Sequence, residues 1–152
     1  MDQPRRAFLS HMETHRTAIT PVLTVSNAAE AIAFYHRAFG AEELHRNAYA
    51  DGRIIVEMAI AGARFRVADE APESWNLSPT TLGGTTVRIN LLVGDPDQVA
   101  KHAVANGATQ IAPVADQSYG LRQGRFADPY GHHWLIGRAL PGIGDWAIEH
   151  RD

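Results

Sequence analysis

The stretch Leu23–Ala41 reads LTVSNAAEAIAFYHRAFGA, and Leu91–Ala108 reads LLVGDPDQVAKHAVANGA. Each begins with a short apolar segment, passes a helix-capping residue, continues through a helical pattern and ends in Gly-Ala. The two stretches lie 68 positions apart in the chain. A repeat at a fixed offset indicates that one structural unit occurs twice.

The boundaries of both helices can be read from capping residues. Asn27 is a good N-cap, and Gly40 stands where a left-handed residue ends a helix. In the second copy Asp95 caps the helix, Pro96 takes its first position and Gly107 ends it. In the first helix the apolar residues fall on one face: Ala28, Ala31, Ile32, Tyr35 and Phe39.

Three strand patterns follow each helix, and they are separated by turn residues. In the first half they are residues 43–50, 53–60 and 63–68; in the second they are 109–116, 121–127 and 132–138. Each half is therefore βαβββ. One such unit covers only one face of its sheet with a helix, so we expect an α+β fold of two βαβββ modules whose sheets face each other around a concave cavity.

The chain length allows one domain. We expect an N-terminal extension over residues 1–16, taken as flexible, a domain over 17–140 and a C-terminal tail over 141–152. The modules span 17–69 and 85–138, and the loop 70–84, rich in proline and glycine, joins them.

Bulk composition excludes several classes of partner. The formal charge is −3, which gives no reason to expect nucleic acid or an anionic membrane surface. No apolar run has the roughly 18 residues of a membrane span, and the N-terminus lacks the apolar core of a signal peptide. With no cysteine in the sequence, we expect a cytoplasmic protein.

Five motifs in this order resemble one known family: AIAFYHRAFGAEE, DGRI, ADEAPE, LGGTTV and FADPYGHHWLI. Together they are similar to the glyoxalase/bleomycin resistance/dioxygenase group, the vicinal oxygen chelate superfamily, and most to its branch resembling the phosphonate-operon B protein. The resemblance runs from about residue 17 to 138. It implies paired βαβββ modules, a homodimer and a ligand cavity lined by the sheets. It does not fix a reaction, because the superfamily holds both enzymes and binding proteins.

Metal-using members of this family place one ligand on the first and last strand of each module. Carried over by position, the resemblance assigns these places to Thr20, Arg66, Arg88 and Leu135. Leucine has no donor atom and arginine has no free lone pair. A divalent cation about 4 Å from an arginine would be opposed by roughly 4 kcal/mol per unit charge. The sequence therefore predicts no metal and no other cofactor.

The paired histidines of DPYGHHWLI do not make a metal site either. Neighbouring side chains on a strand point to opposite faces, so His132 and His133 cannot share one ion. We expect His132 to be structural at the turn and His133 to face the cavity beside Leu135.

The leading hypothesis is a metal-free small-molecule-binding protein, of which a drug-sequestering, antibiotic-resistance protein is one form. If Arg66 and Arg88 face one cavity, we expect an acidic or carbonyl-rich ligand, with Glu57 as an alternative internal partner. The alternative is that both arginines lie along the sheet edge with their guanidinium groups in water. The rival hypothesis is a metal-independent lyase or isomerase that uses His133 or Glu57 as its general base and an arginine to stabilise an enolate or oxyanion. The expected ligand-binding residues are Thr20, Val22, Thr24, Arg66, Trp75, Arg88, Asn90, Tyr119 and Leu135.

Overall fold

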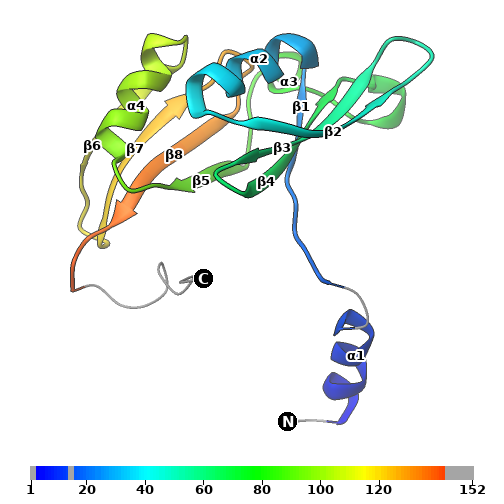
Figure 1. The fold of residues 1–152 in the computed structure, drawn as a ribbon, viewed down its shortest axis with the longest axis horizontal. Coiled ribbons are helices and arrows are strands. Elements are labelled where there is room, and N and C mark those ends of the chain that lie inside the picture. The colour runs from blue at the N-terminus through cyan, green and yellow to red at the C-terminus, as the bar shows by residue number, and fades with distance from the viewer. Residues whose placement is uncertain (1–2, 14–15, 143–152) are drawn as a thin grey trace.

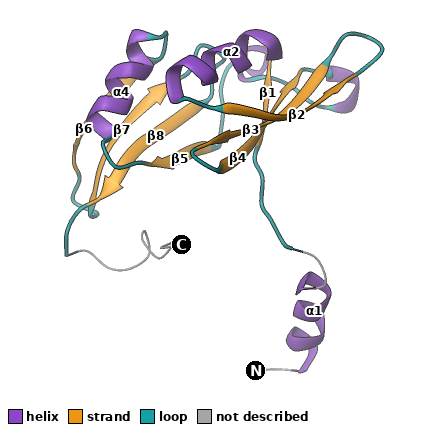
Figure 2. Ribbon diagram, in the orientation of Figure 1, coloured by secondary structure: helices purple, strands orange, loops and turns teal. Residues whose placement is uncertain are grey.

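The computed structural model describes residues 3–13 and 16–142. Two four-stranded sheets lie next to each other, and helices α2 and α4 cover the same side of both (Figure 1). Within residues 3–13 and 16–142, no helix packs on the opposite side of either sheet (Figure 2). We call that side the open face.

Each module has the βαβββ order that the repeat predicts. In the first sheet the strand order is β1-β4-β3-β2, and in the second it is β5-β8-β7-β6, so the same topology occurs twice. The elements of the first module are β1 (Val22–Val25), α2 (Ala28–Phe39), β2 (Glu42–Ala48), β3 (Ile54–Ile60) and β4 (Ala63–Asp69). Those of the second are β5 (Arg88–Leu92), α4 (Pro96–Ala105), β6 (Thr109–Asp116), β7 (Leu121–Ala127) and β8 (His133–Ala139).

The capping residues act as their positions predict. The Asn27 side chain accepts a hydrogen bond from the Glu30 amide at 3.1 Å, and the Asp95 side chain accepts one from Gln98 at 3.1 Å. Gly40 follows α2 with φ at 67°, a left-handed conformation that glycine adopts without strain.

The core lies between the helices and the sheets, and it is continuous across both modules. Trp134 of β8 contacts Phe39 and Tyr35 of α2, with ring centroids 4.7 and 5.5 Å apart. The second module therefore packs its largest side chain onto the helix of the first, which fixes the two sheets relative to each other.

A buried carboxylate organises the turn between β7 and β8. Asp128 is 4% exposed and accepts hydrogen bonds from the Tyr35 hydroxyl at 2.5 Å and from the Trp134 indole at 2.9 Å. Its other oxygen accepts the backbone amides of Tyr130 and His132. Burial, together with the neighbouring Asp128, raises the pKa of Tyr35 well above its ordinary value. The DPYG turn thus serves as a structural joint between the modules.

A further contact crosses the modules at the same place. The His132 Nε2 atom lies 2.8 Å from the Thr24 carbonyl oxygen of β1. This contact agrees with the expectation that His132 is structural.

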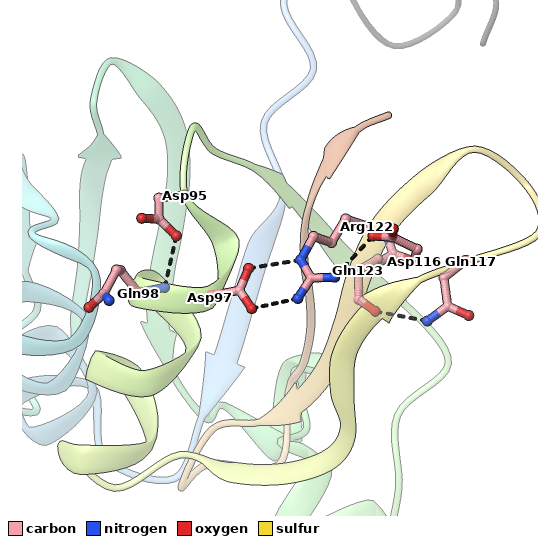
Figure 3. A network of polar contacts seen from close by, with 7 residues as sticks. All are labelled: Asp95, Asp97, Gln98, Asp116, Gln117, Arg122 and Gln123. Atoms are coloured by element: carbon pink, nitrogen blue, oxygen red, sulfur yellow. Dashed lines mark hydrogen bonds and ion pairs between the residues drawn. The ribbon is translucent and has the colours of Figure 1, made fainter. Parts of the chain in front are cut away.

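An ion-pair network holds α4 to the second sheet (Figure 3). Arg122 of β7 donates through Nε and Nη2 to Asp97 of α4 at 2.9 and 2.7 Å, and through Nη1 to Asp116 of β6 at 2.9 Å. The guanidinium lowers the pKa of Asp97.

Two segments contain more secondary structure than the sequence analysis expected. Residues 70–84 include a 3₁₀ turn at Pro72–Ser74 and the short helix α3 at Pro79–Leu82, rather than loop alone. In the N-terminal extension, residues Gln3–Glu13 form helix α1, which stands apart from the sheets (Figure 1). The C-terminal tail from residue 143 lies outside the described residues. In the parts of the chain that the structure describes, no helix has both the length and the apolar character needed to cross a membrane.

Candidate functional site on the open faces of the sheets

Strand alternation decides which side chains reach the open faces. On β4, Phe65 and Val67 are buried beneath α2, so Arg64 and Arg66, which alternate with them along the strand, point to the open face. On β8, Trp134 and Ile136 are buried, so His133 and Leu135 point the other way. Register then assigns the rest of each face, because residues paired across neighbouring strands share a side.

The open face of the first module is balanced in charge. Glu57 of β3 stands opposite Arg66 of β4, and its carboxylate lies 2.9 Å from Arg64 and 3.6 Å from Arg66. Each oxygen of Glu57 thus faces its own guanidinium. An internal acid offsets Arg66, which is one of the two alternatives that the sequence left open.

The open face of the second module carries cations without such an acid. Arg88 of β5 is paired in register with His133 of β8, and Arg125 of β7 donates from Nε to His133 Nδ1 at 2.8 Å. Among the described residues, neither Arg88 nor Arg125 has a carboxylate partner. Arg125 thus contacts His133 directly, and Arg88 stands next to His133 in register on the other side of β8. That part of the chain supplies no internal counter-charge for either arginine.

The electrostatics of His133 follow from this arrangement. Partial burial lowers its pKa, and the positive charge of Arg125 lowers the pKa further. Arginine remains protonated and can only donate, so the Nδ1 atom that it contacts must be an acceptor without hydrogen. His133 is consequently neutral, with its hydrogen on Nε2.

A second polar chain runs beside the histidine. The buried Gln123 of β7 donates from Nε2 to the Asn90 side-chain oxygen at 3.2 Å and accepts from the Tyr119 hydroxyl at 2.8 Å. Gln123 and Arg125 alternate along β7, so both chains lie on the same open face. The structure thus brings together four residues expected from sequence, Arg88, Asn90, Tyr119 and His133, and Leu135 lies among them.

A separate hollow lies between β1 and the segment that leads into β5. It has a volume of about 710 Å³. Val22 and Thr24, two of the predicted ligand-binding residues, line it, and its wall is mainly apolar, with Leu77, Leu82, Val87 and Ile89. The groove reaches β5 at Ile89, whose side chain points to the opposite side of the sheet from Arg88 and Asn90.

Other expected ligand-binding residues are placed as follows. Arg66 is paired with Glu57 on its own sheet, while Arg88 stands beside His133 on the other sheet. Thr20 lies before β1, outside the groove. Trp75 is 88% exposed and has a left-handed conformation after the 3₁₀ turn.

The four positions that correspond to metal ligands in the family do not fit a metal. They are Thr20, Arg66, Arg88 and Leu135, and the two arginines would repel a cation while leucine offers no donor. Over residues 3–13 and 16–142, no three histidine, aspartate or glutamate side chains gather closely enough to hold one ion.

The fold consists of paired βαβββ modules with polar open faces, and comparison with known proteins gives its family. The Glyoxalase/Bleomycin resistance protein/Dioxygenase superfamily model matches residues 11–136. The chain therefore belongs to this superfamily.

Relatives and solved structures are consistent with that placement. The uncharacterized protein Rv0887c of Mycobacterium tuberculosis is 42% identical over 127 residues, covering 81% of this chain and 75% of that protein. TioX from Micromonospora sp. ML1 is 28% identical with a TM-score of 0.63, covering 81% of this chain and 100% of that one. The fosfomycin resistance protein FosX from Listeria monocytogenes is 16% identical with a TM-score of 0.63, covering 84% and 96%, and so shows the fold alone.

Sequence reasoning missed Gln123 and Arg125. A usable pattern was present, since the turn at Asp128–Gly131 fixes an antiparallel hairpin in which Arg125 pairs with Leu135. Once Leu135 is placed on the open face, Arg125 and Gln123 follow from the two-residue period of the strand.

Proposed function

We propose that this protein binds a small molecule without a metal ion, and that the ligand is acidic or carbonyl-rich. The main support for this proposal comes from the open face of the second module. There Arg88 and Arg125 flank His133, and the described residues provide no internal acid for them. Guanidinium groups bind carboxylates in a planar, two-pronged geometry.

The side chains at the family's metal-ligand positions are consistent with ligand binding that needs no metal. Arg88 stands at one of the family's ligand positions and attracts the anionic ligand directly, so it replaces the attraction that a cation would supply. A drug-sequestering, resistance-type role is one form of this function. Membership in the branch that resembles the phosphonate-operon B protein, and a cytoplasmic location, are parts of the same proposal, supported by the motif DGRI and by the lack of cysteine.

The geometry favours binding over general-base catalysis. A base needs a free lone pair, but Arg125 occupies the only lone pair of His133. Glu57 faces Arg64 and Arg66 with its two oxygens. Assaying every ligand for turnover tests the rival lyase or isomerase directly.

We also propose a homodimer. Strands β1 and β5 are the edges of their sheets, and exposed apolar side chains lie on or beside them: Ile19, Val22, Leu82 and Val87. Unpaired edges with apolar neighbours are usually covered by another chain. Light scattering should give twice 16.6 kDa at micromolar concentration, and a mass of 16.6 kDa would contradict the dimer.

The experiment for ligand class uses three probes with one shape: benzoate, benzamide and benzamidine, which are anionic, neutral and cationic. Titration followed by NMR should show benzoate binding more tightly than the other two. Arg88→Gln should weaken benzoate binding by roughly 1.5–3 kcal/mol, or about 10- to 150-fold, because one charged hydrogen bond is lost.

Arg64→Gln is the matched control. It also removes an arginine from an open face, but one whose charge Glu57 already offsets, so benzoate affinity should not change. Tighter binding of benzamidine than of benzoate, or equal losses in both variants, would contradict the proposal.

A further inference from the structure

The contact between Arg125 and His133 determines which ring nitrogen of His133 carries the hydrogen. The Arg125 Nε–H donates to His133 Nδ1 at 2.8 Å. The guanidinium keeps its proton under all conditions in which the protein is folded, so the Nδ1 atom has to stay without hydrogen while the contact exists. The imidazole hydrogen is then confined to Nε2.

The Nε2 atom is the outer nitrogen of the ring, farther from the backbone than Nδ1. His133 projects from β8 on the open face, on the side opposite Trp134. No acceptor for this Nε2–H is present among the residues of 3–13 and 16–142. One oriented hydrogen-bond donor is thus left facing outward.

The charged groups around the ring favour the same state. Arg125 reaches it from β7, Arg88 is its register partner on β5, and His132 precedes it in the turn before β8. Only Asp128, in the turn, acts in the other direction, and its carboxylate is already used by Tyr35 and Trp134. A proton added to Nδ1 would meet the Arg125 Nε–H directly and break the contact.

We propose that Arg125 is a positioning residue that holds His133 in the neutral Nε2–H tautomer, so that His133 donates a hydrogen bond to a carboxylate or carbonyl oxygen of the ligand. This inference rests on the proposed function and identifies how the ligand's oxygen is recognised. Arg88, next to His133 across the β5–β8 pair, supplies the charge for the same oxygen group.

The arrangement also gives a specificity rule. A ligand that presents a donor, such as an ammonium or amidinium group, would meet Nε2–H and two guanidinium groups. A ligand that presents an acceptor would satisfy all of them. His133 thus selects acceptors and does not withdraw protons.

The test is nitrogen NMR of His133 in the full-length protein, assigned by comparison with His133→Gln. In the free wild-type protein at pH 7, Nδ1 should resonate as a bare nitrogen and Nε2 as a protonated one. In Arg125→Gln the ring should return to a mixture of tautomers and gain a proton at higher pH than in the wild type. The control Arg138→Gln removes an exposed arginine from the same strand as His133 and should change neither property.

Benzoate is then added to the same samples. It should move the Nε2–H resonance of the wild type, and Arg125→Gln and His133→Gln should each weaken benzoate by at least about tenfold. The double variant should be no weaker than either single one, because the two residues act as one unit.

The outcomes separate this inference from the function on which it rests. A protonated ring or an Nδ1–H tautomer in the free protein would overturn the inference. So would benzoate binding that moves other resonances but leaves His133 unchanged, although the proposed function would survive. If benzoate moves no resonance of the protein, the proposed preference for anions fails, and the role of His133 in recognising the ligand fails with it.

Discussion

Replacing Asp128 with alanine tests whether this carboxylate joins the two modules. Asp128 is 4% exposed and accepts four hydrogen bonds, from Tyr35, Trp134 and the backbone amides of Tyr130 and His132. The structure predicts a large loss of stability, because the variant removes every acceptor while leaving the four donors in place.

The magnitude follows from the cost of an unsatisfied buried donor, about 1–3 kcal/mol each. The tyrosine hydroxyl can rotate and water can reach the turn, so the four costs do not add fully. We expect Asp128→Ala to lose about 3–5 kcal/mol, the usual cost of breaking a buried charged network. Asp128→Asn keeps one carbonyl oxygen and leaves mainly the Trp134 indole without an acceptor, so this variant should lose about 1–3 kcal/mol of stability.

Urea unfolding followed by far-ultraviolet circular dichroism measures both values, at one fixed protein concentration so that any association cancels. Asp95→Asn is the matched control, because asparagine caps helix α4 about as well as aspartate and the site is exposed. Losses below about 1 kcal/mol for Asp128→Ala, with the fold intact, would refute the reasoning.

Three other outcomes are expected. Arg122→Gln should lower the melting temperature at pH 7 by less than Asp128→Ala does. The Arg122→Gln variant should also lose less stability on acidification than the wild type. Arg122 depresses the pKa of Asp97, and the stability that this gives the wild type is lost as pH falls below 3.8. Melting temperatures that change with pH from 7 to 3 in the same way in both proteins would contradict this expectation. The pKa of Tyr35 is raised above 10.0, so the stability that the neutral hydroxyl contributes is present below that pH and lost above it. The stability of the wild type should therefore fall more steeply than that of Tyr35→Phe between pH 9 and 11. Parallel stability curves for the two proteins would argue against this role of Tyr35. Gly131→Ala should cost on the order of 1–3 kcal/mol in urea unfolding, because φ is 87° and a Cβ would lie 2.7 Å from Pro79; an unchanged midpoint would show that the turn can relax.

The sequence was most informative about the fold. The repeat, the N-caps at Asn27 and Asp95 and the glycine after each helix predicted both helices, and β6 and β7 have the predicted bounds. These features are local, so the chain itself displays them. The short helix α3 was missed because four residues are too few for a periodic pattern.

The site was predictable only where strand alternation decides it. His133, Leu135, Arg88 and Asn90 fall on one face by period and register. The counter-charge of Arg66 was not predictable in the same way, because it depends on Glu57 lying opposite it across β3 and β4. Such a contact between strands is not displayed by a single sequence, and the convergence of Arg66 and Arg88 on one cavity stays a prediction.

The central claim is that an anionic ligand binds the open face of the second module without a metal. The most direct measurement is a calorimetric titration of benzoate into protein dialysed against EDTA, repeated after addition of zinc, manganese or iron(II). The account predicts binding to the metal-free protein with the same affinity in every sample, because Arg88 and the Arg125–His133 pair supply the attraction. Binding that appears only after a divalent ion is added would contradict it.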